Sequence, residues 1–205
     1  MLQIGGFRPW RLALGVVLGL ALASASQAQD FARKGGYAVV GGNYMLEQFT
    51  NPGRFSFGDS WGLNLRLGYR YLPWLSSELE WEFISGFDIN DGQDADGNPI
   101  ERGDLKIDGG NISLNTKAYL MPGRIQPYVL LGVGALYASV TNFGYELSWL
   151  RNVNGVSFSV RGGVGLNVYL GHRWGLTAGV SYVFPVGNLD NLRYLSADAG
   201  FEYRF

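Results

Sequence analysis

Charged side chains occupy every second position in two neighbouring stretches of the chain. Arg66 and Arg70 alternate with leucine and tyrosine, and after a connection of four residues Glu78, Glu80 and Glu82 alternate with leucine, tryptophan and phenylalanine. In an antiparallel hairpin, the even-numbered residues of both strands can face the same side of the sheet, so Arg66 can lie opposite Glu80 or Glu82. In the same way Arg70 can lie beside Glu78. Because guanidinium and carboxylate groups form charge-assisted hydrogen bonds, these residues offer a ladder of ion pairs on one face of a sheet.

The one histidine is the candidate for acid–base catalysis. His172 lies in the turn Gly171–Arg173 with no serine nearby in the sequence, so it has no nucleophile to activate. The chain contains no Gly-x-Ser-x-Gly, phosphate-loop or zinc-ligand motif. We predict that the protein is not an enzyme and uses no cofactor.

Carboxylates that could bind calcium cluster in one segment. Residues 88–104 contain several glycines and six acidic side chains: Asp88, Asp91, Asp94, Asp96, Glu101 and Asp104. The spacing does not match an EF-hand loop, because Pro99 stands where the template needs glycine. The chain has no cysteine, which excludes disulfides and thiolate metal sites. We interpret the segment as a solvated loop and predict no metal site.

The composition favours an all-β chain of one domain. Aromatic residues make up 15% of the 205 residues, and 31 glycines accompany only three methionines. Such a composition favours many short strands separated by turns. The formal net charge is -1, so nothing in the charge balance suggests a nucleic-acid partner.

The N-terminus carries the features of an export signal. Two arginines precede an almost wholly apolar run at residues 12–23, and Ser26-Gln27-Ala28 supplies the small-x-small pattern of a cleavage site. The run is too short for a helical membrane span, which needs about 20 apolar residues. We predict a signal peptide over residues 1–28 and one exported domain over residues 29–205.

Alternation of apolar and polar side chains with a period of two indicates β-strands throughout the mature chain. Apolar residues occupy the odd positions from Leu63 to Tyr71, and mostly the even positions from Val156 to Leu170. Similar patterns predict six further strands at residues 37–47, 79–83, 111–120, 128–140, 174–184 and 195–205.

The connections between these strands alternate in length. Short ones lie at residues 72–75, 121–127 and 171–173, and longer, more polar ones at about residues 48–59, 87–107, 141–154 and 185–193. A barrel with short periplasmic turns, long external loops and both termini in the periplasm produces this alternation. The predicted fold is all-β: an eight-stranded antiparallel up-and-down transmembrane β-barrel in the outer membrane. The alternative is a soluble β-sandwich whose core holds the aromatic residues.

The cost of charge in lipid decides which strand face points outward. Arginine or lysine at the bilayer midplane costs about 2–4 kcal/mol. The charged residues should therefore line the lumen: Arg66, Arg70, Glu78, Glu80, Glu82, Lys117, Arg161, Asp198, Glu202 and Arg204. Aromatic residues near the strand ends are expected to form a girdle at the membrane interfaces. The predicted aromatic girdle comprises Trp61, Tyr71, Trp74, Trp174 and Tyr194.

The predicted lumen residues balance by sign and so can neutralise one another. One interpretation is a gated polar conduit whose salt bridges rearrange, and the other is a plug of side chains that replaces an apolar core. An eight-stranded barrel is only wide enough for its own side chains, which favours the plug. Pairing is expected under either interpretation, because an unpaired buried charge is costly.

Three segments resemble a known family. Residues 126–135, residues 163–170 with the turn that follows, and the terminal Phe-Glu-Tyr-Arg-Phe look like the small outer-membrane β-barrels, the outer-membrane-protein-A-like and porin-like surface proteins. The resemblance covers essentially the whole mature chain, and its motifs are more specific for fold than for function. It also implies that Tyr203 and Phe205 are read by the barrel-assembly machinery.

These features lead to one functional hypothesis and two alternatives. We expect an integral outer-membrane protein with a structural or surface-interaction, adhesin-like role and a lumen filled by a charged network. The expected partners are outer-membrane lipid and lipopolysaccharide around the barrel and a host or surface ligand at the external loops. The alternatives are a narrow porin-like channel and, less favoured, an outer-membrane enzyme that modifies lipid A.

Overall fold

The computed structural model describes residues 31–48, 56–91, 105–142, 155–187 and 189–205. Over these residues the chain forms β1 (Gly35–Glu47), β2 (Ser56–Phe57), β3 (Ser60–Leu72), β4 (Leu75–Asp91), β5 (Leu105–Tyr119), β6 (Ile125–Asn142), β7 (Gly155–Tyr169), β8 (Trp174–Val186) and β9 (Tyr194–Arg204). The predicted signal peptide and most of the acidic segment lie outside the described residues. Within the described ranges, no helix has the length and hydropathy to cross a bilayer.

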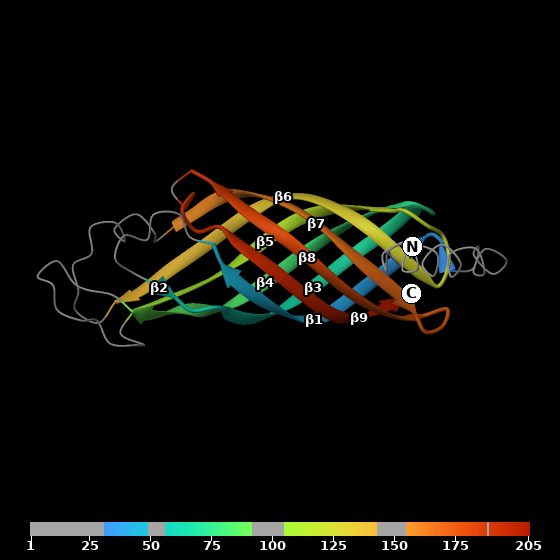
Figure 1. Cartoon of the computed structure of the whole chain (residues 1–205). Helices are drawn as coiled ribbons and strands as arrows, with labels where there is room; N and C mark the ends of the chain where they lie inside the picture. The colour runs from blue at the N-terminus through green and yellow to red at the C-terminus, as the bar shows by residue number, and fades with distance from the viewer. Residues whose placement is uncertain (1–30, 49–55, 92–104, 143–154, 188) are drawn as a thin grey trace, which may run out of the picture.

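Eight of the strands form a closed antiparallel barrel, as the sequence predicted. Each long strand pairs with the next long strand along the chain, and β1 pairs with β9 to close the sheet. The two-residue strand β2 adds to β4. Figure 1 shows the C-terminus beside the short turns at one end of the barrel. We call this end the short-turn end and the opposite one the loop end.

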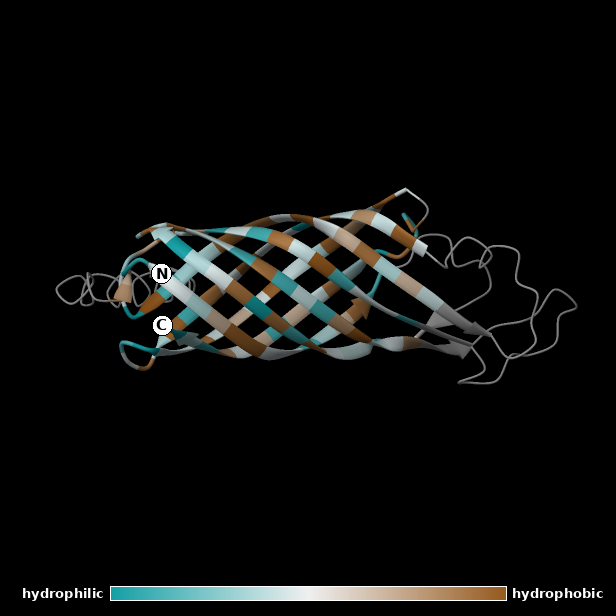
Figure 2. Cartoon of the chain, turned by 180° about the vertical axis from the view of Figure 1, so that it is seen from behind, coloured by the Kyte–Doolittle hydropathy of each residue, from teal (hydrophilic) through white to brown (hydrophobic). Residues whose placement is uncertain are grey.

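The strands alternate between an apolar outer wall and a polar lumen. In β3, Leu65 and Leu67 are exposed on the outer wall, whereas Arg66 between them is 1% exposed. Successive side chains of a strand point to opposite faces, so the alternation of apolar and polar residues produces an apolar outer wall and a polar lumen. Figure 2 shows the resulting mixture of hydrophobic and hydrophilic positions along each strand.

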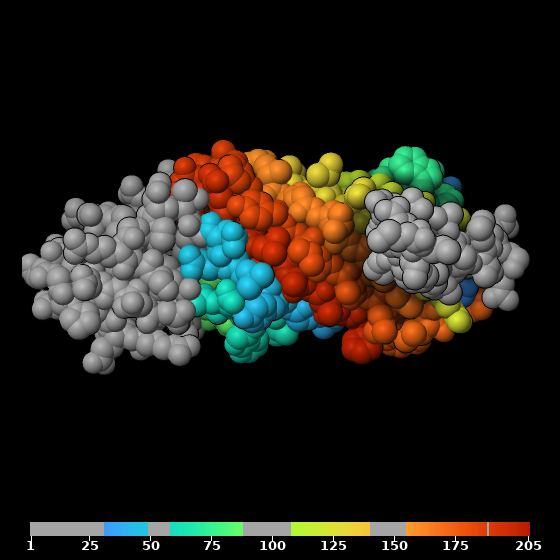
Figure 3. Space-filling model, in the orientation of Figure 1, coloured from blue at the N-terminus to red at the C-terminus, as the bar shows by residue number. Residues whose placement is uncertain are grey.

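The seam between the first and last strands is paired over almost its whole length. The ladder runs from Tyr37 opposite Arg204 to Glu47 opposite Tyr194. Figure 3 shows the side chains of β1 and β9 packed side by side along this seam. A closed ladder satisfies the backbone groups that a bilayer could not hydrate.

Strands β4 and β5 extend further than the alternation indicated. The sequence predicted a connection from Phe87 to Ile107, but these two residues are partners in the β4–β5 ladder. A register shift follows Ile84, and Gly86 has a φ of 107°. Such a bulge breaks the period of two, which explains why the sequence pattern missed the end of β4.

Candidate functional site

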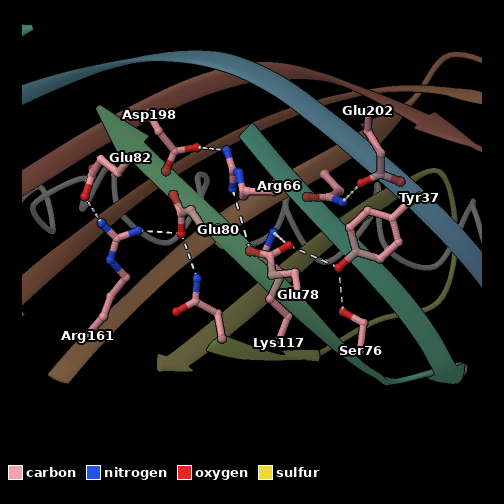
Figure 4. Close-up of polar contacts among 12 residues, drawn as sticks. Tyr37, Arg66, Ser76, Glu78, Glu80, Glu82, Lys117, Arg161, Asp198 and Glu202 are labelled. Atoms are coloured by element: carbon pink, nitrogen blue, oxygen red, sulfur yellow. Dashed lines mark hydrogen bonds and ion pairs between the residues drawn. The ribbon is translucent and has the colours of Figure 1, made fainter. Parts of the chain in front are cut away.

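A network of buried charges fills the barrel lumen. Nine of the ten predicted lumen residues are at most 5% exposed inside the barrel: Arg66, Arg70, Glu78, Glu80, Glu82, Lys117, Arg161, Glu202 and Arg204. Asp198 joins them through an ion pair with Arg66. Figure 4 shows that the side chains come from opposite sides of the barrel and meet in the middle. Carboxylates and cations are present in equal number, so the network as a whole is neutral.

Glu82 on β4 accepts hydrogen bonds from four side chains. Asn43 Nδ2 and Ser196 Oγ donate to its Oε1, each at 2.7 Å. Tyr194 Oη donates to Oε2 at 2.7 Å, and Arg161 Nη2 donates to the same oxygen. The four donors come from β1, β7 and β9, so this carboxylate ties together strands that are far apart around the barrel.

Arg161 on β7 bridges two carboxylates of β4. Its Nη1 lies 2.5 Å from Glu80 Oε2, and its Nη2 pairs with Glu82. Asn115 Nδ2 donates to the same Glu80 oxygen at 2.7 Å. Buried guanidinium groups need such partners, because the cost of removing a charge from water is large. Arg161 therefore links the two halves of the barrel wall across the lumen.

A third cluster of ion pairs lies around Glu78, nearer the short-turn end. Lys117 Nζ lies 2.8 Å from Glu78 Oε2, and Tyr37 Oη donates to the same oxygen at 3.1 Å. Arg66 Nη1 lies 4.0 Å from Glu78 Oε1, while its Nη2 lies 2.5 Å from Asp198 Oδ2. This cluster joins β1, β3, β4, β5 and β9.

The predicted ion-pair partners within the first hairpin are wrong, because the ion pair that forms there joins Arg66 to Glu78, with 4.0 Å between Nη1 and Oε1. The backbone register does place Arg66 opposite Glu80, as parity permitted. The guanidinium, however, extends across the lumen to Asp198 on β9. Parity fixes the face of the sheet but not the direction of a long side chain, and inside a narrow barrel the nearest carboxylate can belong to a distant strand.

Arg70 also differs from its prediction, because it does not pair with Glu78. Its Nη1 donates to Gln126 Oε1 at 2.7 Å, and its Nη2 donates to the carbonyl oxygen of Pro73. The guanidinium lies over the ring of Tyr119, 3.8 Å from the ring centre. The Arg70 guanidinium is therefore stabilised by two neutral hydrogen-bond acceptors and by a cation–π contact with Tyr119.

The residues that precede β1 pack into the short-turn end of the lumen. Phe31 is buried, and its ring stacks on Tyr169 with 6.1 Å between ring centres. Arg204 Nη1 donates to the Phe31 carbonyl oxygen at 2.5 Å, and Arg204 Nε pairs with Glu202 Oε1 at 2.9 Å. We call Phe31 and its contacts the N-terminal plug. Sequence reasoning missed it, although an aromatic residue just after the predicted cleavage site was visible.

The connection between β8 and β9 packs into the barrel at the loop end. Leu189 and Leu192 are buried in the barrel mouth. The Leu189 backbone N donates to Ser157 Oγ at 3.1 Å, and Arg193 lies 4.3 Å from the ring centre of Phe184. We call this segment the β8–β9 lid. The sequence predicted a polar loop here, yet two leucines three residues apart were the signal for inward packing.

The space left inside the network is small. A cavity among Arg66, Glu80, Arg161 and Asp198 has room for about one water molecule. Gly179 borders it, and a side chain at Gly179 would contact Tyr128 Oη at 2.9 Å. The described residues contain no group of three or more side chains that could hold a metal ion. The arrangement can pair charges and exclude solvent.

Four of the five predicted girdle residues lie on the outer wall. Trp61, Tyr71, Trp74 and Trp174 are exposed there. The prediction for Tyr194 is wrong, because its side chain is 1% exposed and donates to Glu82 inside the lumen. Tyr194 shares its parity with the inward residues Ser196 and Glu202, a signal that the sequence already held.

The predicted assembly residues close the outer wall near the C-terminus. Tyr203 lies 4.8 Å from Trp174 and 5.6 Å from Phe205 between ring centres. The Phe205 backbone N donates to the Gly36 carbonyl oxygen at 3.0 Å. Phe205 is exposed. The three rings form a continuous aromatic surface at the short-turn end.

His172 lies in the predicted turn at the short-turn end. Its side chain is exposed, and its ring stacks near Phe31 with 6.1 Å between ring centres. This contact accounts for the histidine as part of the turn beside the N-terminal plug.

Known proteins share both the sequence pattern and the fold. The family profile described as "Outer membrane protein beta-barrel domain" matches residues 15–205. Neisserial surface protein A is 15% identical, with 83% of this chain and 97% of that chain covered and a TM-score of 0.58. Ail, the attachment invasion locus protein of Yersinia pestis, is 17% identical, with coverage of 84% and 100% and a TM-score of 0.54.

OprG from Pseudomonas aeruginosa is 17% identical, with coverage of 84% and 97% and a TM-score of 0.53. Ail is also known in a complex with the heparin analogue sucrose octasulfate. Identities this low show a shared fold. No curated protein sequence matches the chain.

Proposed function

Because this chain belongs to the outer-membrane protein β-barrel family, we propose that it is a closed barrel that presents its loop end for contact with a surface partner. The location in the outer membrane follows from the family. In such barrels the long loops lie outside the cell and the short turns in the periplasm. The proposed role is therefore interaction at the cell surface and not transport through the lumen.

The filled lumen is the observation that carries this proposal. Five cations and five carboxylates occupy the middle of the barrel, the N-terminal plug covers one end, and the β8–β9 lid covers the other. A solute moving through the lumen would have to break several buried ion pairs at once. Breaking a single buried pair typically costs about 3–5 kcal/mol. A wall of this kind supports loops rather than conducting solutes.

The charge of the acidic segment indicates the chemistry of the partner. Residues 88–104 carry six acidic side chains and a single basic one, Arg102. A sulfated polysaccharide would be repelled by such a segment, so the heparin analogue bound by Ail is not the ligand that we propose here. We propose a partner with a neutral or basic contact surface.

Attachment of cells tests the proposal. A non-adherent Gram-negative strain that displays the chain should attach to cultured epithelial monolayers more than the same strain with an empty vector. Amidation of the acidic loop by Asp94→Asn, Asp96→Asn, Glu101→Gln and Asp104→Asn should lower attachment, whereas Arg124→Gln at the opposite end should not. Equal attachment with and without the chain, at matched amounts in the outer membrane, would reject the surface role. Competition by heparin would reject the proposed partner chemistry.

The remaining predictions about the envelope belong to the same proposal. We propose that lipopolysaccharide and phospholipid contact the exposed girdle residues Trp61, Tyr71, Trp74 and Trp174, and that the barrel-assembly machinery reads Tyr203 and Phe205. Removal of residues 1–28 by signal peptidase stays a prediction, testable by N-terminal sequencing. A narrow channel is the rival function. Some polar atoms in the lumen, such as Asn64 Nδ2 and Oδ1, have no hydrogen-bond partner among the described residues. These atoms could bind water inside a channel.

A further inference from the structure

Four cationic side chains meet at a cavity at the short-turn end, beside the start of β1. The cavity is lined by Arg33, Lys34, Arg70 and Arg204, together with Gly35, Gly36, Tyr37 and Phe205. None of these lining residues is an aspartate or glutamate, and the carboxylate among them is the terminal one of Phe205. The cavity has room for about one group the size of a water molecule. Arg33 and Lys34 are exposed, so they stand at its entrance.

Arg70 is a buried cation without a charged partner. It is 2% exposed, and no carboxylate of the described residues forms an ion pair with it. Its Nη atoms donate to neutral oxygens, and its Nε has no hydrogen-bond partner within the described ranges. A buried charge in this state is unfavourable unless a counter-ion reaches it. Arg70 therefore points to an anion that is supplied from outside the chain.

The other cations of the cavity strengthen the positive field at this point. Arg204 is neutralised by Glu202, 2.9 Å away. Arg33 and Lys34 form no ion pair with a carboxylate of the described residues. Arg33, Lys34 and Arg70 outnumber the terminal carboxylate of Phe205, so the cavity carries a surplus of positive charge. Clusters of basic side chains that converge in this way recognise phosphate oxygens through charge-assisted hydrogen bonds.

The same end of the barrel lies at the depth of lipid headgroups. Trp74 and Trp174 are exposed on the outer wall beside the short turns, where aromatic residues mark the boundary between hydrocarbon and water. We propose that the mouth of the cavity binds a phosphate group, with one oxygen entering the cavity toward Arg70 and the rest of the group held outside it by the exposed Arg33 and Lys34. The group is carried either by a phospholipid of the adjoining leaflet or by a free phosphate. This site does not depend on the proposed surface role.

Two binding measurements on the mature chain separate the sources of phosphate. In a neutral detergent, inorganic phosphate is titrated while the unfolding temperature is followed by the heat-dependent shift of the folded band on a gel. In nanodiscs that contain phosphatidylglycerol and phosphatidylcholine in equal amounts, native mass spectrometry counts the phosphatidylglycerol that stays bound after gentle release.

The variants are chosen so that the barrel still folds. The test variant R33Q/K34Q changes two exposed residues at the cavity entrance, and the control R124Q/R173Q changes two exposed arginines at the same end that do not line the cavity. We expect the test variant to weaken binding by about tenfold or more, since a hydrogen bond between charged groups contributes at least that factor. We expect the control to bind as the wild type does. R70Q, if it folds, should behave as the test variant.

Each outcome decides the proposal. Retention of phosphatidylglycerol without a response to inorganic phosphate supports the site with a phospholipid as its ligand. A response to inorganic phosphate without lipid retention supports the site with free phosphate as its ligand. The absence of both, or an equal loss of binding in R33Q/K34Q and R124Q/R173Q, overturns the site and leaves only a general attraction of anions to this end.

Discussion

In β3, Leu65 and Leu67 expose 39% and 47% of their surface on the outer wall, while Arg66 between them is 1% exposed in the lumen. The outer wall needs only apolar character, because lipid makes no specific demands on an alkyl side chain. The lumen needs specific polar partners, because a buried charge is costly unless an opposite charge or a hydrogen-bond partner meets it. We therefore expect the outer wall to tolerate changes of shape and the lumen to tolerate only changes made in pairs.

Loss of Glu82 is expected to have the largest effect. Glu82→Leu removes the acceptor of four side chains and leaves Arg161 with Glu80 alone. We expect the free energy of unfolding to fall by about 3–5 kcal/mol, the cost of breaking a buried ion pair. Urea unfolding of the chain refolded into lipid vesicles measures this change.

A double-mutant cycle that combines Glu82→Leu with Arg161→Leu serves as the control. Removing both partners should cost clearly less than the sum of the two single losses, because no unpaired charge remains between them. Strictly additive losses would mean that the two side chains do not interact in the lumen.

A charge placed on the outer wall should have the next largest effect. Leu131 on β6 is 71% exposed and lies between Val129 and Val133, which are also exposed on the outer wall. Leu131→Arg should lower the free energy of unfolding in vesicles by about 2–4 kcal/mol, whereas Leu131→Ala should change it far less. If arginine and alanine cost the same, this position does not face the hydrocarbon.

Removal of the N-terminal plug should cost less than either change. Phe31→Ala loses the stacking on Tyr169 at a site near the chain start that can relax. We expect a loss of about 1–2 kcal/mol, below the 3–5 kcal/mol of a phenylalanine in a closed core. His172→Ala, which touches the same ring from outside, is the matched control and should cost less. The temperature of the heat-dependent gel shift reports both, and a larger loss for His172→Ala would contradict the plug.

The smallest expected effect comes from removing one tyrosine hydroxyl, either in the lumen or on the outer wall. Tyr194→Phe removes a hydroxyl that donates to Glu82, so it should lower the free energy of unfolding by about 0.5–1.5 kcal/mol. Tyr69→Phe removes the same hydroxyl from the outer wall, where the side chain is 57% exposed, and should change stability very little. Equal effects in urea unfolding would remove the distinction between the two faces.

The sequence predicts those features of the fold that follow from the two-residue alternation of side chains in a strand. It predicted eight strands, their closure and the inward face of residues such as Arg66 and Lys117, because a single charged residue in lipid is costly enough to fix the parity of a strand. It did not predict the partners inside the lumen. Arg66 reaches Asp198, which is 132 residues away, and no local spacing encodes that contact.

The misplaced and missing residues have a common physical cause. The residue type of Tyr194 predicts a place in the girdle, whereas its position two residues before Ser196 predicts the lumen, where it lies. The N-terminal plug and the β8–β9 lid use Phe31, Leu189 and Leu192 outside the strands, where no period applies. Such contacts join segments that meet only in the closed barrel, so no local sequence pattern encodes them.

Single-channel recording tests the central claim most directly. The mature chain is inserted into a planar lipid bilayer at neutral pH, and the current is recorded at voltages of both signs. A lumen filled by the charge network and closed at both ends predicts no steady unit conductance above that of the bare bilayer. A steady unit conductance in the wild type that changes in size with Glu82→Gln would contradict the closed lumen and identify the network as the wall of a channel.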